Sequence, residues 1–128
     1  MKTLKPLLLS FIILISVTQV RAQTNRVGTS ISEVTESYLA VKTALEAEDG
    51  TATSAKAKEL LTALKGVPSK RMTSGQLMLW TKYFGQLIFD TRHISEVDRV
   101  HYQKEHFKRL TKNLHTILEG FKMNKAGI

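Results

Sequence analysis

The sequence contains no cysteine and only two prolines among its 128 residues. Without cysteine there can be no disulfide bond, no thiolate metal centre and no cysteine nucleophile. The sequence also lacks a glycine-rich phosphate loop, a His-Glu-x-x-His zinc motif and a Gly-x-Ser-x-Gly nucleophile elbow. No catalytic chemistry is therefore indicated, and we expect a protein that is not an enzyme and has no catalytic residues.

The first 22 residues have the pattern of a secretory signal peptide. Lys2 and Lys5 precede an almost wholly apolar run over residues 7–20, and Val20-Arg21-Ala22 suits a signal peptidase. The run is shorter than the roughly 20 apolar residues that a membrane-spanning helix needs. We therefore expect cleavage after Ala22, a location in the periplasm or outside the cell, and no stable membrane insertion after cleavage.

The net charge of the full chain is +8, which would ordinarily suggest an anionic partner such as nucleic acid. Three of the basic residues, Lys2, Lys5 and Arg21, lie in the predicted signal peptide, so the mature chain carries +5. An exported protein has little reason to meet nucleic acid. We therefore expect no nucleic-acid partner.

Apolar residues recur with helical spacing through the rest of the chain, and no stretch alternates as a strand would. Short connections between such helices favour antiparallel neighbours, so we predict an all-α fold, an antiparallel up-down four-helix bundle. The predicted organisation is a signal peptide at 1–22, a flexible N-terminus at 23–29, the bundle at 30–122 and a tail at 123–128. The expected helices run from 30 to 49, from 51 or 53 to 65, from 75 to 93 and from 98 to 121.

Three features define the expected helix ends. Ser30 and Glu33 fit a capping box at the start of the first helix. Gly50 suits a left-handed position that would end this helix, and Asp98 can cap the start of the last one.

Three of the four histidines are candidate metal ligands: His93, His101 and His106. At about 100° per residue, His101 and His106 point about 140° apart, so one helix cannot bring both to the same ion. A site would need His93, near the end of the third helix, together with His101 or His106 from the fourth. Copper or zinc would suit imidazole ligands, although the sequence establishes no cofactor. The alternative is that these histidines are ordinary residues at the protein surface or at the boundary of the core and bind no metal.

Methionine thioethers could add soft ligands to such a site. Met72 and Met78 flank the start of the third predicted helix, and Met123 follows the fourth. Core packing is the more common role of methionine, and we favour it here.

Two surface features bear on partner binding. On the fourth helix a basic stripe recurs at spacings of three and four, either a solvated face or a site for an anionic partner: His101, Lys104, Lys108, Lys112 and His115. On the third helix Met78 and Phe89 lie on a second line about 110° from the main apolar stripe of Leu77, Trp80, Phe84, Leu87 and Ile88. Such a line indicates either central burial between two neighbours or a docking strip.

The order of several segments resembles the domain-of-unknown-function family 3347, found in exported bacterial proteins. The similar segments are Tyr38 to Leu45, the alanine-rich helix with Leu60-Leu61, Trp80, His93-Ile94 and Gln103 to Thr111. The resemblance covers about residues 33–121. It implies a link to heavy-metal efflux, because some members accompany or are fused to periplasmic adaptor subunits of efflux systems. The family's C-terminal Cys-Pro-Met segment, a candidate copper ligand, has no counterpart here.

These observations lead to two hypotheses. The first is a non-catalytic periplasmic helical module that binds a protein partner, such as an efflux adaptor, through Met78 and Phe89 or through Lys104, Lys108 and Lys112. The alternative is a protein that binds or buffers a metal directly with histidine and methionine ligands.

Overall fold

The computed structural model describes residues 26–125. The chain is helical from residue 26, where the description starts, to residue 46, and we call this segment the N-terminal helix. Three further α-helices follow, α2 (Gly50–Lys65), α3 (Ser74–Glu96) and α4 (Val100–Lys125), with a short 3₁₀ helix η1 (Ser69–Arg71) before α3. No strand occurs among these residues, so the predicted all-α four-helix fold is confirmed. The predicted signal peptide lies outside the described residues.

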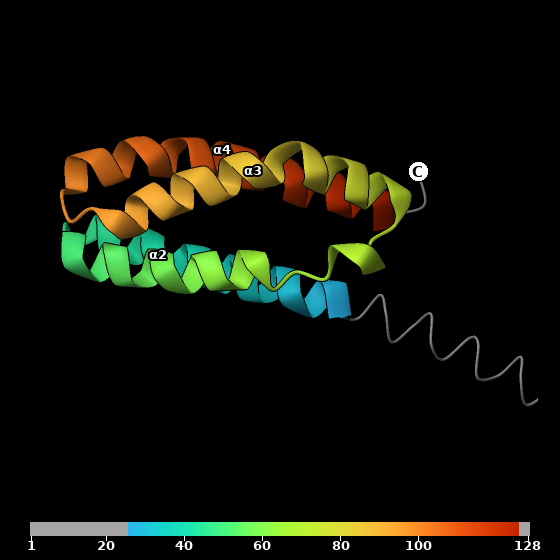
Figure 1. The fold of residues 1–128 in the computed structure, drawn as a ribbon, viewed down its shortest axis with the longest axis horizontal. Coiled ribbons are helices and arrows are strands. Elements are labelled where there is room, and N and C mark those ends of the chain that lie inside the picture. Colours follow the sequence, from blue (N-terminus) through green and yellow to red (C-terminus); the bar gives the residue numbers. More distant parts are fainter. Residues whose placement is uncertain (1–25, 126–128) are drawn as a thin grey trace, which may run out of the picture.

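Consecutive helices reverse direction and pack side by side (Figure 1). The N-terminal helix lies along α2, and α3 lies along α4. Connections 47–49 and 97–99 are at one end of the bundle, and connection 66–73 is at the other. The N-terminal helix also contacts α4, since the Tyr38 ring stacks on Phe107 at 5.1 Å and its hydroxyl lies 3.0 Å from Oγ1 of Thr111. The four helices thus enclose one core.

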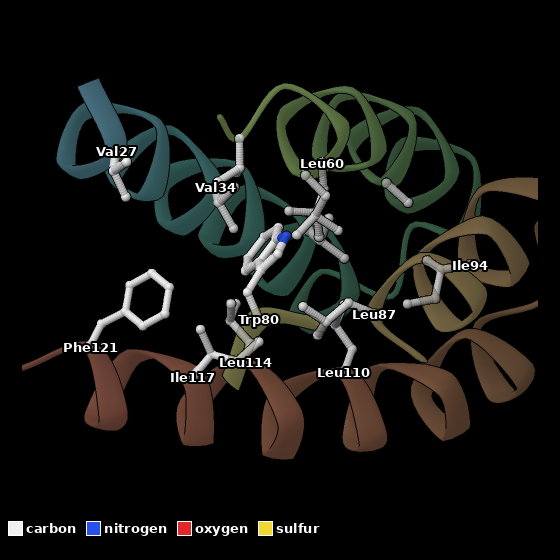
Figure 2. Packing of buried hydrophobic residues seen from close by; sticks show 14 of the residues in the cluster. Val27, Val34, Leu60, Trp80, Leu87, Ile94, Leu110, Leu114, Ile117 and Phe121 are labelled. Atoms are coloured by element: carbon white, nitrogen blue, oxygen red, sulfur yellow. The ribbon is translucent and has the colours of Figure 1, made fainter. Parts of the chain in front are cut away.

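All four helices contribute buried side chains to this core (Figure 2). Full burial of one leucine or isoleucine side chain contributes about 1.5–3 kcal/mol, so these contacts dominate the stability of the bundle. The expected apolar stripes supply most of the core: Val34, Val41, Leu45, Leu60, Leu64, Trp80, Leu87, Leu110, Leu114, Ile117 and Phe121.

The first helix starts and ends differently from the sequence-based expectation. Residues 26–29, expected to be flexible, are helical, and Val27 is buried in the core. Ser30 therefore lies inside the helix and cannot cap it. At the other end Glu48 takes the left-handed conformation (φ 55°), while Asp49 caps α2 by accepting from the Ala52 amide at 2.9 Å. The predicted role of Gly50 was wrong, because Asp49 offers a side-chain acceptor and Gly50 begins the next helix.

The last two helices are longer than expected. Thr73 caps α3 with a capping box to Gln76, and the helix continues through Ile94 and Ser95, both buried, to Glu96. The connection therefore shortens to 97–99, and α4 begins at Val100, two residues after the predicted cap Asp98. α4 extends to Lys125, so the predicted tail is helical as far as it is described. Burial of Ile94 and Ser95 explains the longer α3, since tertiary packing stabilises helix ends whose position intrinsic helix propensity does not determine.

None of the helices in the described part of the chain is long and apolar enough to cross a lipid bilayer.

Candidate functional site

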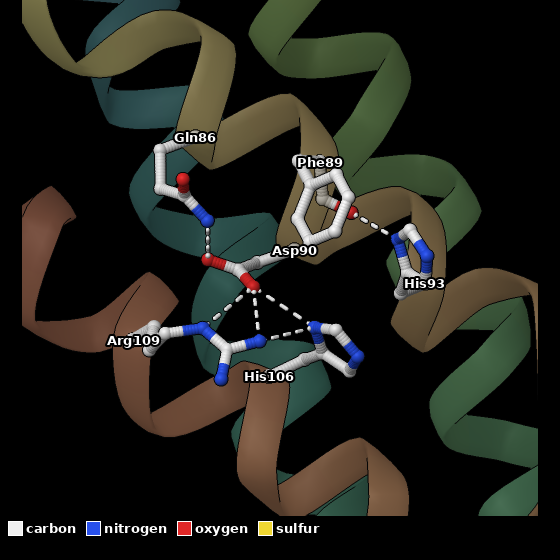
Figure 3. Close-up of polar contacts among 6 residues, drawn as sticks. All are labelled: Gln86, Phe89, Asp90, His93, His106 and Arg109. Atoms are coloured by element: carbon white, nitrogen blue, oxygen red, sulfur yellow. Dashed lines mark hydrogen bonds and ion pairs between the residues drawn. The ribbon is translucent and has the colours of Figure 1, made fainter.

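A fully buried carboxylate, Asp90 on α3, lies at the centre of a polar cluster between α3 and α4 (Figure 3). Its Oδ1 accepts from Nε of Arg109 at 3.1 Å and from Nη2 of Arg109 at 2.9 Å. Nδ1 of His106 lies 2.9 Å from the same oxygen, and Nε2 of Gln86 donates to Oδ2 at 3.0 Å. Removing a carboxylate from water is costly unless it is paired and hydrogen-bonded, and both conditions are met here.

Two imidazole rings lie next to this carboxylate. His93, in the last turn of α3, stacks on His106 of α4 with ring centroids 4.8 Å apart and planes inclined by 20°. The Phe89 ring flanks both, at 4.2 Å from the His93 centroid and 5.9 Å from the His106 centroid. We call His93 and His106 the imidazole pair.

The hydrogen bonds of the imidazole pair indicate which nitrogens carry protons. Nδ1 of His93 lies 2.9 Å from the Phe89 carbonyl oxygen, which can only accept, so this nitrogen must be the donor. Nδ1 of His106 lies between two possible partners, Oδ1 of Asp90 and Nη2 of Arg109, the latter at 2.8 Å. In the tautomer with a proton on Nδ1, His106 donates to Asp90, and in the other tautomer its Nδ1 accepts from Nη2 of Arg109. With protons on both Nδ1 atoms, the neutral forms of His93 and His106 each carry a lone pair on Nε2.

The structure separates the three predicted metal ligands. His93 and His106 lie side by side, which is one of the two combinations predicted from the sequence. His101 is exposed and its ring contacts Tyr102 at 5.6 Å, on a different side of α4 from His106. Among the described residues, no group of three histidine or acidic side chains is arranged to hold a metal ion.

The methionines do not join the imidazole pair. Met72 packs against the core, as favoured from the sequence. The favoured packing role is wrong for Met78, which is 74% exposed and lies about 22 Å from His93 along the α3 axis. The side chain of Met123 lies outside what the structure describes.

The second line of α3 is exposed along its length. We define the α3 strip as Met78, Lys82, Gly85 and Phe89, which succeed one another at spacings of four, three and four. Phe89 is 48% exposed, and a Cβ added at Gly85 would have no atom within 4 Å. Burial between two neighbouring helices, one of the two interpretations of this line, is therefore wrong for the chain by itself. Leu77, expected on the buried stripe, is also exposed.

The basic stripe of α4 faces solvent, but acidic residues accompany it. Lys104 forms an ion pair with Glu48, while Lys108 and Lys112 are exposed. Lys104 and Lys108 line a shallow groove of about 290 Å³ between the N-terminal helix and α4, and both signs of charge occur around it: Lys42, Glu46 and Glu48 complete its charged rim. A solvated face explains this arrangement without an anionic ligand.

Two buried polar residues were not predicted from the sequence, although each one lies on an apolar stripe of its helix. Asp90 follows Leu87 by three positions and precedes Ile94 by four, which places a carboxylate on the buried stripe. Gln103 lies likewise on the core face of α4, seven positions before Leu110. A polar residue in an apolar register indicates a buried network, because a wholly unpaired polar side chain would be too costly there. Gln103 uses its Nε2 in this way, while its buried Oε1 has no partner among the described residues.

A protein-family model described as "Protein of unknown function (DUF3347)" matches residues 34–126, a range that includes the Asp90 cluster and the α3 strip. No curated protein and no solved structure matches the chain.

Proposed function

Because its family model matches most of the sequence, this chain belongs to the DUF3347 family of proteins of unknown function, and from that premise we propose a binding role. We propose that the protein is a non-catalytic, exported helical module that binds a periplasmic protein partner through the α3 strip. The proposed partner is an adaptor subunit of a heavy-metal efflux system.

The observation that carries this proposal is the alignment of exposed apolar side chains on one helix. Single exposed apolar residues are ordinary in soluble proteins. Here Met78 and Phe89 share a line with Gly85 between them, which leaves a flat position where a second helix can approach closely. A glycine inside a helix costs about 1 kcal/mol relative to alanine. Close approach of a partner gives a physical reason for that cost.

Charge indicates the chemistry of the partner. Lys82 lies within the α3 strip and Arg92 continues it by one turn, and both residues are exposed. The nearby Asp90 is buried, and Arg109 balances its charge. An amphipathic helix with apolar anchors and acidic flanks would therefore complement this face, in the helix-on-groove mode of recognition.

Export and the link to metal handling rest on other features. The basic start, apolar run and Val-Arg-Ala sequence of residues 1–22 support export. The resemblance of residues 33–121 to a family in which some members accompany or are fused to efflux adaptors supports the choice of partner.

Calorimetric titration with a purified efflux adaptor from the same organism tests the proposal. We expect the wild-type protein to bind and a Met78→Gln/Phe89→Gln variant to lose at least about tenfold in affinity, or 1.4 kcal/mol. A Leu39→Gln/Tyr102→Gln variant is the matched control, since these side chains are 49% and 52% exposed on other helices. Circular dichroism should show equal helix content in all three proteins. Absence of wild-type binding, or equal losses in both variants, would contradict the proposal.

Direct metal binding is a second candidate function, and the imidazole pair is the observation in its favour. Methionine ligation loses support, because Met78 is remote from the pair and Met72 packs against the core.

A further inference from the structure

We propose that Nε2 of His93 and Nε2 of His106 form a two-imidazole site for a divalent transition-metal ion, with Cu²⁺ preferred over Zn²⁺. The site lies on the surface where the end of α3 meets the start of α4. This inference deepens the second candidate function and does not depend on partner binding.

Helix packing brings these two side chains together from different helices. The short connection 97–99 reverses the chain, so the last turns of α3 lie against the first turns of α4. The two rings lie face to face at 4.8 Å, whereas two histidines five positions apart on α4 could not do so. The pair is accessible, since the His106 side chain is 19% exposed and His93 is half-buried.

Both Nδ1 atoms lie within hydrogen-bond distance of a protein acceptor, which leaves both Nε2 atoms as potential metal ligands. His93 donates to the Phe89 carbonyl oxygen, and His106 donates to Asp90 when its Nδ1 carries the proton. In Figure 3 the two Nε2 atoms point to the same side, away from Asp90. The hydrogen bonds of both rings involve Nδ1. The Phe89 carbonyl oxygen selects for His93 the tautomer that a metal at Nε2 requires, and Asp90 provides an acceptor for the same tautomer of His106.

The partners of the two Nδ1 atoms are those typical of metal-binding histidines. Such residues commonly donate their second ring N–H to a carboxylate or a backbone carbonyl, which fixes the ring and raises its basicity. One member of the pair uses a carbonyl and the other a carboxylate. Arg109 balances the charge of Asp90, so the carboxylate can orient His106 without itself binding the ion.

Metal binding requires a small rearrangement of the resting pair. Metal–nitrogen bonds of about 2.0–2.1 Å require the two Nε2 atoms to converge to within about 4 Å. A shift of the half-buried His93 side chain that keeps Nδ1 near the Phe89 carbonyl oxygen would provide this convergence, while His106 stays in contact with Asp90. Water would complete the coordination. Two imidazoles with open positions favour Cu²⁺, which binds nitrogen ligands more tightly than Zn²⁺ does.

Titration of the untagged protein with copper sulfate in a non-coordinating buffer, followed by calorimetry and electron paramagnetic resonance, tests the site. We expect one strongly bound Cu²⁺ per chain, hyperfine splitting from two imidazole nitrogens, and weaker binding of Zn²⁺. His93→Ala should lower Cu²⁺ affinity at least tenfold without disturbing the Asp90 hydrogen bonds. His106→Ala should do the same, with its melting temperature measured because it removes one donor to Asp90.

A His101→Ala/His115→Ala variant is the matched control and should bind Cu²⁺ as the wild type does. Equal Cu²⁺ affinity in the wild type and the His93→Ala variant would overturn the proposal, as would loss of binding in the control. No partner protein is present in this titration. Its failure therefore leaves the adaptor proposal standing, and failure of the adaptor titration leaves the metal site standing.

Discussion

Gln103 of α4 donates from its buried Nε2 to the carbonyl oxygen of Gly50, the first residue of α2, at 2.8 Å and across 53 positions of sequence. The same nitrogen lies 2.7 Å from the carbonyl oxygen of Val97, in the connection between α3 and α4. One side chain therefore joins the start of α2 to the connection between α3 and α4. Nε2 of Gln103 also lies 3.3 Å from the carbonyl oxygen of Ile94 on α3, so Gln103 links the two helices that carry the imidazole pair.

Replacing Gln103 by leucine should lower the free energy of unfolding by roughly 2–4 kcal/mol, because its buried side chain would no longer donate to the carbonyl oxygens of Gly50, Val97 and Ile94. Urea denaturation followed by circular dichroism measures the change. Lys108→Ala, at an exposed position of the same helix, should stay within about 0.5 kcal/mol of the wild type. A Gln103→Leu protein as stable as the control would show that these hydrogen bonds contribute little.

The same glycine-to-alanine change should have opposite effects at two positions. A Cβ at Gly50 would lie 1.7 Å from the backbone oxygen of Asp98, which cannot move without displacing the connection. Gly50→Ala should therefore destabilise the fold by at least about 2 kcal/mol. Gly85→Ala should stabilise it by about 0.5–1 kcal/mol, since its Cβ meets nothing and alanine favours the helix. Thermal unfolding of the two variants measures both effects, and a shift of the same sign in both would contradict this account.

Arg109 and Lys104 both form ion pairs on α4, but they should differ in their contribution to stability. Arg109→Ala would leave the fully buried Asp90 without its cation, and we expect a loss of about 2–4 kcal/mol. Lys104→Ala removes an ion pair in which both side chains are at least half exposed, so the loss should stay below about 1 kcal/mol. Chemical denaturation at low and high salt measures both, and equal losses would contradict the distinction.

The pKa of the Glu119 carboxyl lies below its ordinary value, because Nζ of Lys122 donates a hydrogen bond to it and adds a favourable positive charge. A carboxyl with a lowered pKa in the folded state stabilises the fold above its ordinary pKa, and this contribution is lost as the pH falls through the lowered value. The Glu119 side chain is half exposed to solvent, which screens the interaction, so the contribution to stability should be small.

Titration of the Glu119 carboxyl carbon by nuclear magnetic resonance measures this shift. Lys122→Ala should raise the pKa towards its ordinary value, whereas Lys122→Arg keeps the cation and should keep the pKa low. An unchanged pKa in Lys122→Ala would show that the shift has another cause.

The sequence by itself determined the fold class and most of the core. Helical periodicity is local, and Val34, Leu60, Leu87 and Leu114 occupy predictable positions on their apolar stripes. The helix ends were less predictable. Gly50 could have ended the first helix, but Asp49 instead caps α2, because its side chain accepts a hydrogen bond from the Ala52 amide. The extension of α3 through Ile94 depends on burial by other helices.

Only the tertiary structure decided which side chains meet across helices. The sequence allowed His93 to pair with His101 or with His106, and the rotation of α4 against α3 selected His106. The same rotation placed Arg109 on Asp90 and left Met78 and Phe89 exposed. That rotation is set by the packing of the whole core, since every buried side chain must fit at once, and no local pattern specifies it.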